Sequence, residues 1–205
     1  FSIMCLVAKD KRLEEVQQKA VEKVAHYAEQ NMIYTRVQED GNMKYEKADN
    51  IACAYFTHMT SRPAKREDSS VEKVPDPGLH THLVFANATK RQDGKFRSVV
   101  FDKYYDHQLL MGEIYRMELE RGAREAGYQT NLFRDKKSGR WAFEIDGGST
   151  YTNLDKDIKE FSTRRSDIEE MAVKEGKFDS KSMAFFAKIT RDEKIEFSKE
   201  ALEEN

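Results

Sequence analysis

The chain has 205 residues, enough for one large domain or for one domain with a helical extension. Apolar residues make up 39% and charged residues 35%, which supports a hydrophobic core with long solvated helix faces. The formal net charge of −2 does not mark the whole chain as a nucleic-acid binder, so only local clusters of basic residues could bind DNA. No apolar stretch reaches the ~18 residues needed to span a membrane, and no signal peptide is visible.

The first part of the sequence predicts a strand, a helix and a hairpin. Residues 1–8 are a continuous apolar run, which favours a buried strand. Apolar residues then recur at helical spacing over 10–30, which indicates an amphipathic helix. The runs on either side of Asp40 and Gly41 are typical of a β-hairpin with these two residues in its turn.

The middle of the sequence predicts three more strands and a long loop. Residues 51–59 are strongly apolar and form a strand that contains His58 near its end. Residues 61–76 are polar and lack apolar periodicity, which predicts a surface loop. The segment 79–88 alternates well enough for a central strand, and another strand is expected over 95–101, after an Asp-Gly turn.

The rest of the sequence predicts a helix over 104–126, a hairpin over 128–145, and then short charged helices. We therefore predict an α+β fold in which an antiparallel β-sheet has helices packed on one side. Two units are expected: a core over 1–153 that holds the candidate site, and a helical C-terminal extension over 154–205.

The two cysteines, Cys5 and Cys53, each lie in an apolar run, and their spacing matches neither a redox motif nor a zinc motif. We expect two buried free thiols, as in a protein of the reducing cytoplasm. Together with the lack of a visible signal peptide, this pattern predicts a cytoplasmic location.

Three histidines form the most informative pattern in the sequence. Residues two apart in a strand point to the same face, so His80 and His82 project side by side, as two ligands of one metal ion must. His58 can complete a three-nitrogen site if the strands over 51–59 and 79–88 are neighbours. Imidazole suits zinc and other transition ions, and catalytic sites often combine three protein ligands with an open position. Spacing alone leaves a metal site and a chance His-x-His pair equally open.

The sequence around these histidines resembles the third motif of conjugative relaxases of the MobF family, the TraI/TrwC type. That motif is a His followed by Thr-Ser-Arg, then Asp-Pro-x-Leu-His-Thr-His, then a strand with Asn, Thr and an Asp-Gly turn. The corresponding residues are His58, Thr60-Ser61-Arg62, Asp76 to His82, Asn87, Thr89 and Asp93-Gly94. The resemblance extends from residue 1 to about residue 170, and it implies the palm-like fold of the HUH relaxases.

Two departures from the family pattern matter. The loop between His58 and His80 is longer than is usual in the family. The family's nucleophilic tyrosine, and the aspartate that activates it, lie near the N-terminus and would fall before Phe1, where the chain begins without a methionine. We therefore expect an N-terminal segment to precede Phe1 in the parent protein, and we expect no catalytic nucleophile in the chain itself.

The resemblance implies site- and strand-specific nicking and strand transfer of plasmid DNA in conjugation, by metal-assisted transesterification to that tyrosine. His58, His80 and His82 would hold a divalent metal ion (Mg, Mn, Zn or Ni) against the scissile phosphate. The implied partners are origin-of-transfer single-stranded DNA, a type IV secretion coupling protein, relaxosome accessory proteins and a C-terminal helicase domain of the parent protein. The implied setting is the bacterial cytoplasm, with no membrane partner.

Basic residues near the histidines are candidates for DNA contacts. Arg62 belongs to the family motif and is the best candidate for a phosphate contact. Two predicted hairpins carry further basic clusters that could bind backbone phosphates. These residues are Lys90, Arg91, Lys95 and Arg97 on the first hairpin, and Arg134, Lys136, Lys137 and Arg140 on the second. The pattern alone favours ordinary solvated charge, whereas the resemblance favours DNA. Trp141 and Phe143 could stack on bases, although core positions are the simpler interpretation.

Two other functions stay open at this point. A rolling-circle replication initiator shares the metal chemistry but carries its tyrosine after the histidine motif, and Tyr104, Tyr105 and Tyr115 lie on such a downstream helix. A DNA-binding domain with a structural zinc would need the metal for folding rather than for cleavage.

Overall fold

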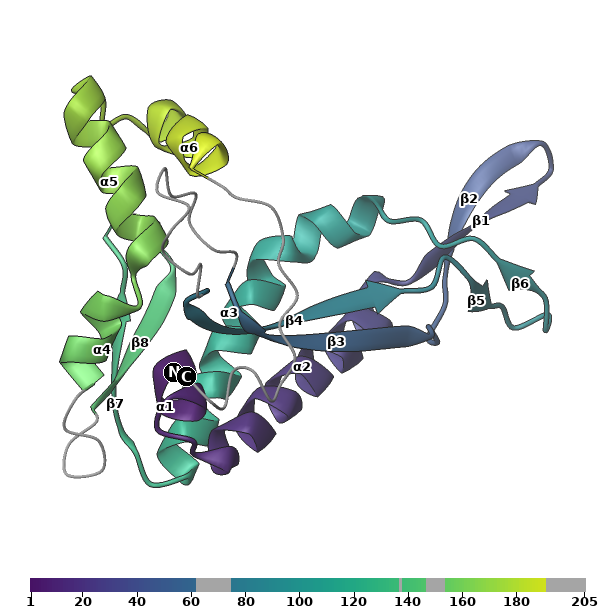
Figure 1. Ribbon diagram of the computed structural model, residues 1–205. Helices are drawn as coiled ribbons and strands as arrows, with labels where there is room; N and C mark the ends of the chain where they lie inside the picture. The colour runs from purple at the N-terminus through teal and green to yellow at the C-terminus, as the bar shows by residue number, and fades with distance from the viewer. Residues whose placement is uncertain (62–74, 137, 147–153, 191–205) are drawn as a thin grey trace.

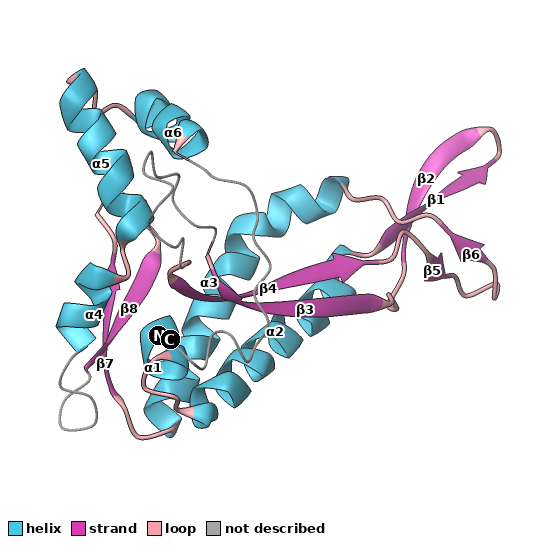
Figure 2. Cartoon of the chain, in the orientation of Figure 1, coloured by secondary structure: helices cyan, strands magenta, loops and turns pink. Residues whose placement is uncertain are grey.

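The computed structural model of the chain describes residues 1–61, 75–136, 138–146 and 154–190. Within these ranges it contains helices α1–α6 and strands β1–β8, and every strand pair is antiparallel (Figure 1, Figure 2). The predicted α+β class is therefore confirmed.

The N-terminal segment is a helix, and the strand predicted over residues 1–8 is wrong. Helix α1 (Ser2–Leu6) buries Met4 and Cys5 in the main hydrophobic cluster. Its bonding is helical, because the amide of Cys5 donates to the carbonyl of Phe1 over 3.0 Å. A continuous apolar run does not distinguish a buried strand from a buried helical turn, so packing decided the outcome.

Two long helices form the base of the molecule. Helices α2 (Lys11–Met32) and α3 (Asp102–Glu125) pack along each other, and apolar periodicity predicted both. They approach most closely at Gly122, where an added Cβ would lie only 2.4 Å from Cγ1 of Val16. Asp10 caps α2 by accepting a hydrogen bond from the amide of Arg12 over 3.0 Å.

The strands form separate pairs, whereas the sequence suggested one larger sheet. The pairs are β1 (Tyr34–Glu39) with β2 (Asn42–Lys47), β3 (Cys53–Thr60) with β4 (Pro77–Phe85), β5 (Thr89–Lys90) with β6 (Phe96–Arg97), and β7 (Gln129–Arg134) with β8 (Trp141–Asp146). Among the described residues no pair joins another. The strand expected over 95–101 is mostly absent, because Val99 and Val100 turn into buried positions after the short β6.

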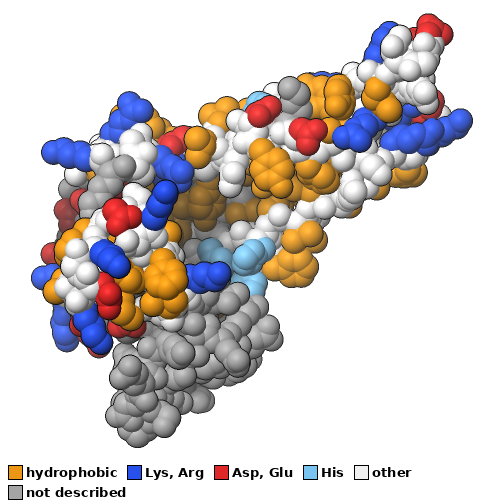
Figure 3. All heavy atoms as spheres, turned by 90° about the horizontal axis from the view of Figure 1, so that it is seen from above, with side chains coloured by type: hydrophobic (Ala, Val, Ile, Leu, Met, Phe, Trp, Pro, Cys, Tyr) orange, Lys and Arg blue, Asp and Glu red, His pale blue; other side chains and the backbone are white. Residues whose placement is uncertain are grey.

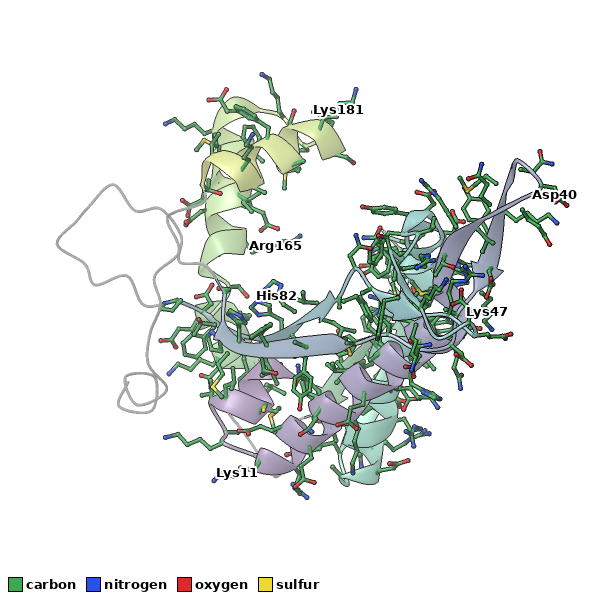
Figure 4. The ribbon with its side chains drawn as sticks, turned by 90° about the vertical axis from the view of Figure 1, so that its right-hand side faces the viewer. Lys11, Asp40, Lys47, His82, Arg165 and Lys181 are labelled. Carbon is green, nitrogen blue, oxygen red and sulfur yellow. The ribbon has the colours of Figure 1, made fainter. Side chains whose placement is uncertain are left out.

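The pair β3–β4 lies across α2 and α3, which cover the β4 side of one of its faces, while Tyr55 on the β3 side of that face is 51% exposed (Figure 4). Phe85 on this face packs against a cluster formed by both helices, which contains Ala28, Met32 and Met111. Leu79, on the same face of β4, packs against the main cluster. The opposite face of the pair is turned away from α2 and α3.

Two hairpins project from this body as an arm, which we define as residues 34–47 and 89–97 (Figure 1). The β1–β2 turn is the predicted one, with φ of 52° at Asp40 and 78° at Gly41, as two-residue hairpin turns of type I′ require. Arg91 joins the two hairpins, because its Nη2 is 2.7 Å from Oε2 of Glu46.

The chain after β8 is helical where it is described, as the sequence predicted. The helices are α4 (Leu154–Glu160), α5 (Thr163–Glu175) and α6 (Ser180–Ile189). Helix α5 ends at Gly176 in the left-handed conformation, and the side chain of Asp179 caps α6. Helices α5 and α6 stand on the side of the β3–β4 pair that carries His82 (Figure 4). None of the described helices combines the length and apolar character that a membrane crossing requires.

Candidate metal centre

The register of β3 and β4 brings three histidines together. His58 lies directly opposite His80, and His82 follows two positions later along β4. The ring centroids are 5.3 Å apart for His58 and His80, 5.0 Å for His58 and His82, and 5.2 Å for His80 and His82. The adjacency of the two strands, on which the predicted trio depended, is therefore confirmed.

All three imidazoles project from the face that α2 and α3 leave uncovered. His80 and His82 are exposed and His58 is half-buried. Figure 3 shows histidine side chains at the surface on this side of the molecule, with lysine and arginine side chains close to them. The face continues with Phe56 and Val84, which are 56% and 53% exposed. A phosphate group can thus approach the histidines from solvent.

A β-bulge next to the histidines shapes the start of β4. The pairing is regular up to His58 and His80 and then shifts before Thr60 pairs with Pro77. Gly78 lies in this bulge, and an added Cβ would be only 2.9 Å from the backbone nitrogen of Ser61. A larger residue at this position would force the two strands apart beside the histidines, which explains the glycine in the Asp-Pro-Gly-Leu-His segment.

The bulge also orients one imidazole. Nδ1 of His80 is 2.6 Å from the carbonyl oxygen of Gly78. A carbonyl can only accept, so Nδ1 carries the proton and Nε2 keeps its lone pair for a ligand. Metal-binding histidines commonly have this kind of partner on their second nitrogen, because it sets the tautomer and the ring orientation.

The spacing of the rings fits three ligands around one ion. With metal–nitrogen distances of about 2.0–2.1 Å and near-tetrahedral angles, imidazole centroids should lie about 5 Å apart, which agrees with the observed 5.0–5.3 Å. As the side chains stand, no three His, Cys, Asp or Glu side chains in the described part of the chain form a finished metal-binding group. Three neutral imidazoles suit a divalent transition ion and leave its charge uncompensated.

The basic residues expected to contact DNA do not form one cluster. Arg62 and Lys137 lie outside the described residues. Lys90, Lys95 and Arg97 are exposed on the arm, whereas Arg91 is engaged with Glu46 and Asp93. The remaining basic residues are Arg134, Lys136 and Arg140, which are exposed on the β7–β8 hairpin at the other end of the molecule (Figure 1).

The two candidate aromatic residues of β8 differ in environment. Phe143 packs against the main cluster and meets the ring of Phe1 edge-on, with centroids 6.4 Å apart. Its core position agrees with the simpler interpretation of the sequence. Trp141, at the start of the strand, is 43% exposed and is accessible to a ligand.

The tyrosines of α3 lie away from the histidine face. Tyr115 is half-buried on α3, while Tyr104 packs on Phe85, on the face of β4 that the helices cover. Tyr105 is 71% exposed on α3. Since α3 lies beneath the strand pair, this placement speaks against a nucleophile on the downstream helix, as a rolling-circle initiator would need.

Sequence reasoning did not single out the polar residues that lie directly beneath the histidines. Gln17 is 3% exposed, and its amide nitrogen donates to Oγ1 of Thr81 over 2.5 Å. Oγ1 of Thr81 is in turn 3.1 Å from Oγ1 of Thr57. A signal existed, because Gln17 falls between Leu13 and Ala20 on the apolar stripe of its helix, where a polar residue is unusual.

Comparison with known proteins gives a consistent result. The family model described as "TrwC relaxase" matches residues 1–205. The "Multifunctional conjugation protein TraI" of Escherichia coli (strain K12) is 28% identical over 192 residues, which are 89% of this chain and 10% of that protein. The chain thus spans about a tenth of the length of the curated relative that it matches.

Solved structures of relaxases resemble the fold over nearly the whole chain. A metal-bound structure of the conjugative relaxase TrwC in complex with oriT DNA matches with a TM-score of 0.75 and 28% identity, over 98% of this chain and 64% of that one. A copper-bound TrwC–oriT complex has the same TM-score and identity and is covered over 62% of its chain. TrwC with a 27-mer DNA that comprises the recognition hairpin and the cleavage site also matches with a TM-score of 0.75, at 28% identity, over 98% of this chain and 65% of that one.

Proposed function

Because the chain belongs to the TrwC relaxase family, we propose that it is the part of a conjugative relaxase that holds a divalent metal ion and the scissile phosphate of single-stranded DNA. The reaction is site- and strand-specific nicking, followed by strand transfer. The observation that carries the proposal is the trio of His58, His80 and His82, with centroids 5.0–5.3 Å apart on an uncovered strand face. Relatives of similar fold have metal-bound structures with oriT DNA.

The histidines prepare the site for an anionic substrate. His58, His80 and His82 would hold a divalent ion, which would supply Lewis acidity and offset the charge that develops on the phosphate. The three imidazoles bind as neutral ligands, so they do not reduce the positive charge at the site. The carbonyl of Gly78 holds the proton of His80 on Nδ1 and thereby presents Nε2 to the open side.

In the reaction that the family resemblance implies, the attacking group is a tyrosine. Its phenolic oxygen forms a bond to the phosphorus while the bond from phosphorus to the 3′ oxygen breaks, and the 3′ oxygen leaves as a hydroxyl after taking up a proton. The 5′ phosphate stays on the tyrosine, so a later 3′ hydroxyl can reverse the exchange and reseal a strand.

The exposed basic residues supply contacts to the DNA backbone. Lys90, Lys95 and Arg97 on the arm, and Arg134 and Arg140 on the β7–β8 hairpin, are available for phosphates. Arg62 is assigned a phosphate contact on the basis of the family motif. Further partners are a type IV secretion coupling protein, relaxosome accessory proteins and a helicase domain of the parent protein, in the bacterial cytoplasm.

Nicking of an oriT oligonucleotide by the intact relaxase tests the metal site. We expect His80→Ala to lower the cleavage rate by on the order of 100-fold or more, while DNA binding is largely kept. His26→Ala is the matched control, because His26 is an exposed histidine on α2 that does not belong to the trio on β3 and β4. Unchanged cleavage by His80→Ala would contradict the proposal.

Chelation separates this function from that of a DNA-binding domain with a structural zinc. The histidines lie outside the three hydrophobic clusters, so we expect EDTA to abolish nicking without melting the protein. Circular dichroism and nicking are measured on the same samples. A chelated protein that unfolds would favour the structural zinc instead.

A further inference from the structure

A hydrogen-bonded chain that starts at the buried Gln17 and ends at the exposed Thr57 lies under the histidines, on the face of the strand pair that is turned to α2. The amide nitrogen of Gln17 donates to the hydroxyl of Thr81 over 2.5 Å, and this hydroxyl is 3.1 Å from that of Thr57. Since Thr81 accepts from Gln17, its own proton is free to point toward Thr57. The chain therefore runs from helix α2 through β4 to β3.

The two threonines are next to the histidines in the chain, so their positions affect where the histidine backbones lie. Thr81 lies between His80 and His82 in the sequence, and Thr57 immediately precedes His58. Thr57 and Thr81 also form a register pair. Because side chains alternate along a strand, the threonine hydroxyls point to α2 while the neighbouring imidazoles point to the opposite side. A shift of either threonine thus moves the histidines with it.

The strand pair needs such an anchor at this place. Its register shifts directly after the pair of His58 and His80 and pairing resumes at Thr60 and Pro77, so the ladder is irregular on that side. In the described ranges β3 and β4 have no other strand on their outer edges. A contact from α2 to both strands therefore adds to the strand hydrogen bonds in fixing the relative position of the three rings.

Gln17 is itself held in place from behind. It is 3% exposed, so its amide cannot exchange its partners for water. Burial raises the pKa of the Tyr115 phenol on α3, and the side chain of Gln17 partly offsets this rise. The anchor thus extends from α2 to both strands.

We propose that Gln17 is a positioning residue for the metal site, acting through Thr81 and Thr57 to hold the three imidazoles at the spacing that one ion requires. The inference rests on the proposed function, because it assumes that the histidines bind a metal ion. It adds a residue that touches neither the ion nor the DNA.

Cobalt(II) binding by the chain tests this role with a readout that does not depend on nicking. We expect Gln17→Leu to weaken Co²⁺ affinity by on the order of 10-fold, the lower end of the loss seen when groups behind metal ligands are removed. The visible absorption of the bound Co²⁺ should also change, because the ligand geometry changes. Gln18→Leu is the matched control, since Gln18 bonds only along the helix surface to Glu22, over 3.0 Å, and it should leave affinity and spectrum unchanged.

A second pair of variants keeps the test decisive if Gln17→Leu folds poorly. Thr81→Val removes the hydroxyl and should reproduce the loss of Co²⁺ affinity, while Thr81→Ser keeps it and should retain near-normal affinity. Combined with Gln17→Leu, Thr81→Val should add little further loss, because both changes break the same hydrogen bond.

The outcomes separate the two proposals. If the unaltered chain binds no Co²⁺, the metal site of the proposed function fails. If it binds Co²⁺ and the folded Gln17→Leu and Thr81→Val variants bind it with the same affinity and spectrum, only the positioning role fails. Urea unfolding of each apo variant identifies a change that affects stability alone, which would also overturn the inference.

Discussion

The hydroxyl of Tyr128 donates a hydrogen bond to the carboxylate of Asp10, which caps helix α2 and lies 118 positions earlier in the chain. The guanidinium of Arg12 approaches the same carboxylate to 2.5 Å. The hydrogen bond from Arg12, with a further one from Tyr128, holds the pKa of Asp10 well below its usual range. This contact ties the start of α2 to the start of the β7–β8 hairpin.

Asp10→Asn should make folding stability less dependent on pH. The folded pKa of Asp10 is depressed, so its contribution is present above the unfolded value of about 3.9 and is lost as pH falls toward the folded value. Asparagine still caps a helix, so the variant removes mainly the charge. We expect it to be less stable than the unaltered chain at pH 7, with the gap narrowing below about pH 4. Urea unfolding across this range measures the gap, with the exposed Glu15→Gln as control, and a constant gap would contradict the assignment.

Gly122→Ala should destabilise the packing of α2 on α3. The new Cβ would lie 2.4 Å from Cγ1 of Val16, so one of the helices must shift. Overpacking of this kind costs about 1–3 kcal/mol, against at most about 1 kcal/mol gained from the higher helix propensity of alanine. We expect a net loss in the free energy of unfolding, and a smaller loss when Val16→Ala is added to Gly122→Ala. If Gly122→Ala were as stable as the unaltered chain, the contact with Val16 would not restrict how closely α2 and α3 pack.

The two thiols should differ sharply in reactivity. Burial raises the pKa of Cys5 to about 12, whereas Cys53 is exposed. The expectation of two buried thiols is therefore wrong for Cys53. At pH 8 a disulfide reagent such as DTNB should modify one thiol in the native protein and both in denaturant. Cys53→Ser should remove the native reaction and Cys5→Ser should keep it, and rapid modification of Cys5 in the native Cys53→Ser variant would disagree with the packing of α1.

Replacement of the exposed arm residues should weaken DNA binding in a salt-dependent way. For Lys95→Gln with Arg97→Gln, we expect the slope of log affinity against log salt to fall by about 1.4, or about 0.7 for each lost phosphate contact to a single strand. Lys11→Gln is the control, because Lys11 lies at the end of α2 farthest from the arm (Figure 4). Fluorescence anisotropy with an oriT oligonucleotide gives the slopes, and equal slopes for all three proteins would exclude the arm as a phosphate-binding surface.

Local patterns in the sequence predicted most of the elements. Apolar periodicity predicted α2 and α3 because each has one face on a core, and the Asp40-Gly41 turn was predictable because only a few residues adopt its positive φ angles. The strand predicted over residues 1–8 failed because an apolar run carries no period. The pairing of β3 with β4 depends on tertiary structure. The sequence analysis could therefore state it only as a condition for the three-histidine site.

The candidate site also combines features that the sequence predicted with features that it could not predict. The spacing of His80 and His82 required only the alternation of a strand, and their place beside His58 followed once the strands were neighbours. The role of Gln17 depends on a contact between residues 64 positions apart, and no local pattern encodes such a contact. The sequence placed the basic residues on two hairpins, but it could not show that these hairpins lie at opposite ends of the molecule.

The opposition of His58 and His80 across the strand pair also has a consequence for folding fidelity. A slip of β3 by one residue would turn His58 toward the helices and leave Thr57 or Met59 beside the other two imidazoles. Any ligand that needs all three rings binds only the correctly aligned pairing, so it selects this pairing from the misaligned ones by mass action. The distance along the chain between the strands does not enter this selection, so the connecting segment is free to vary in length among related proteins without altering the histidine trio.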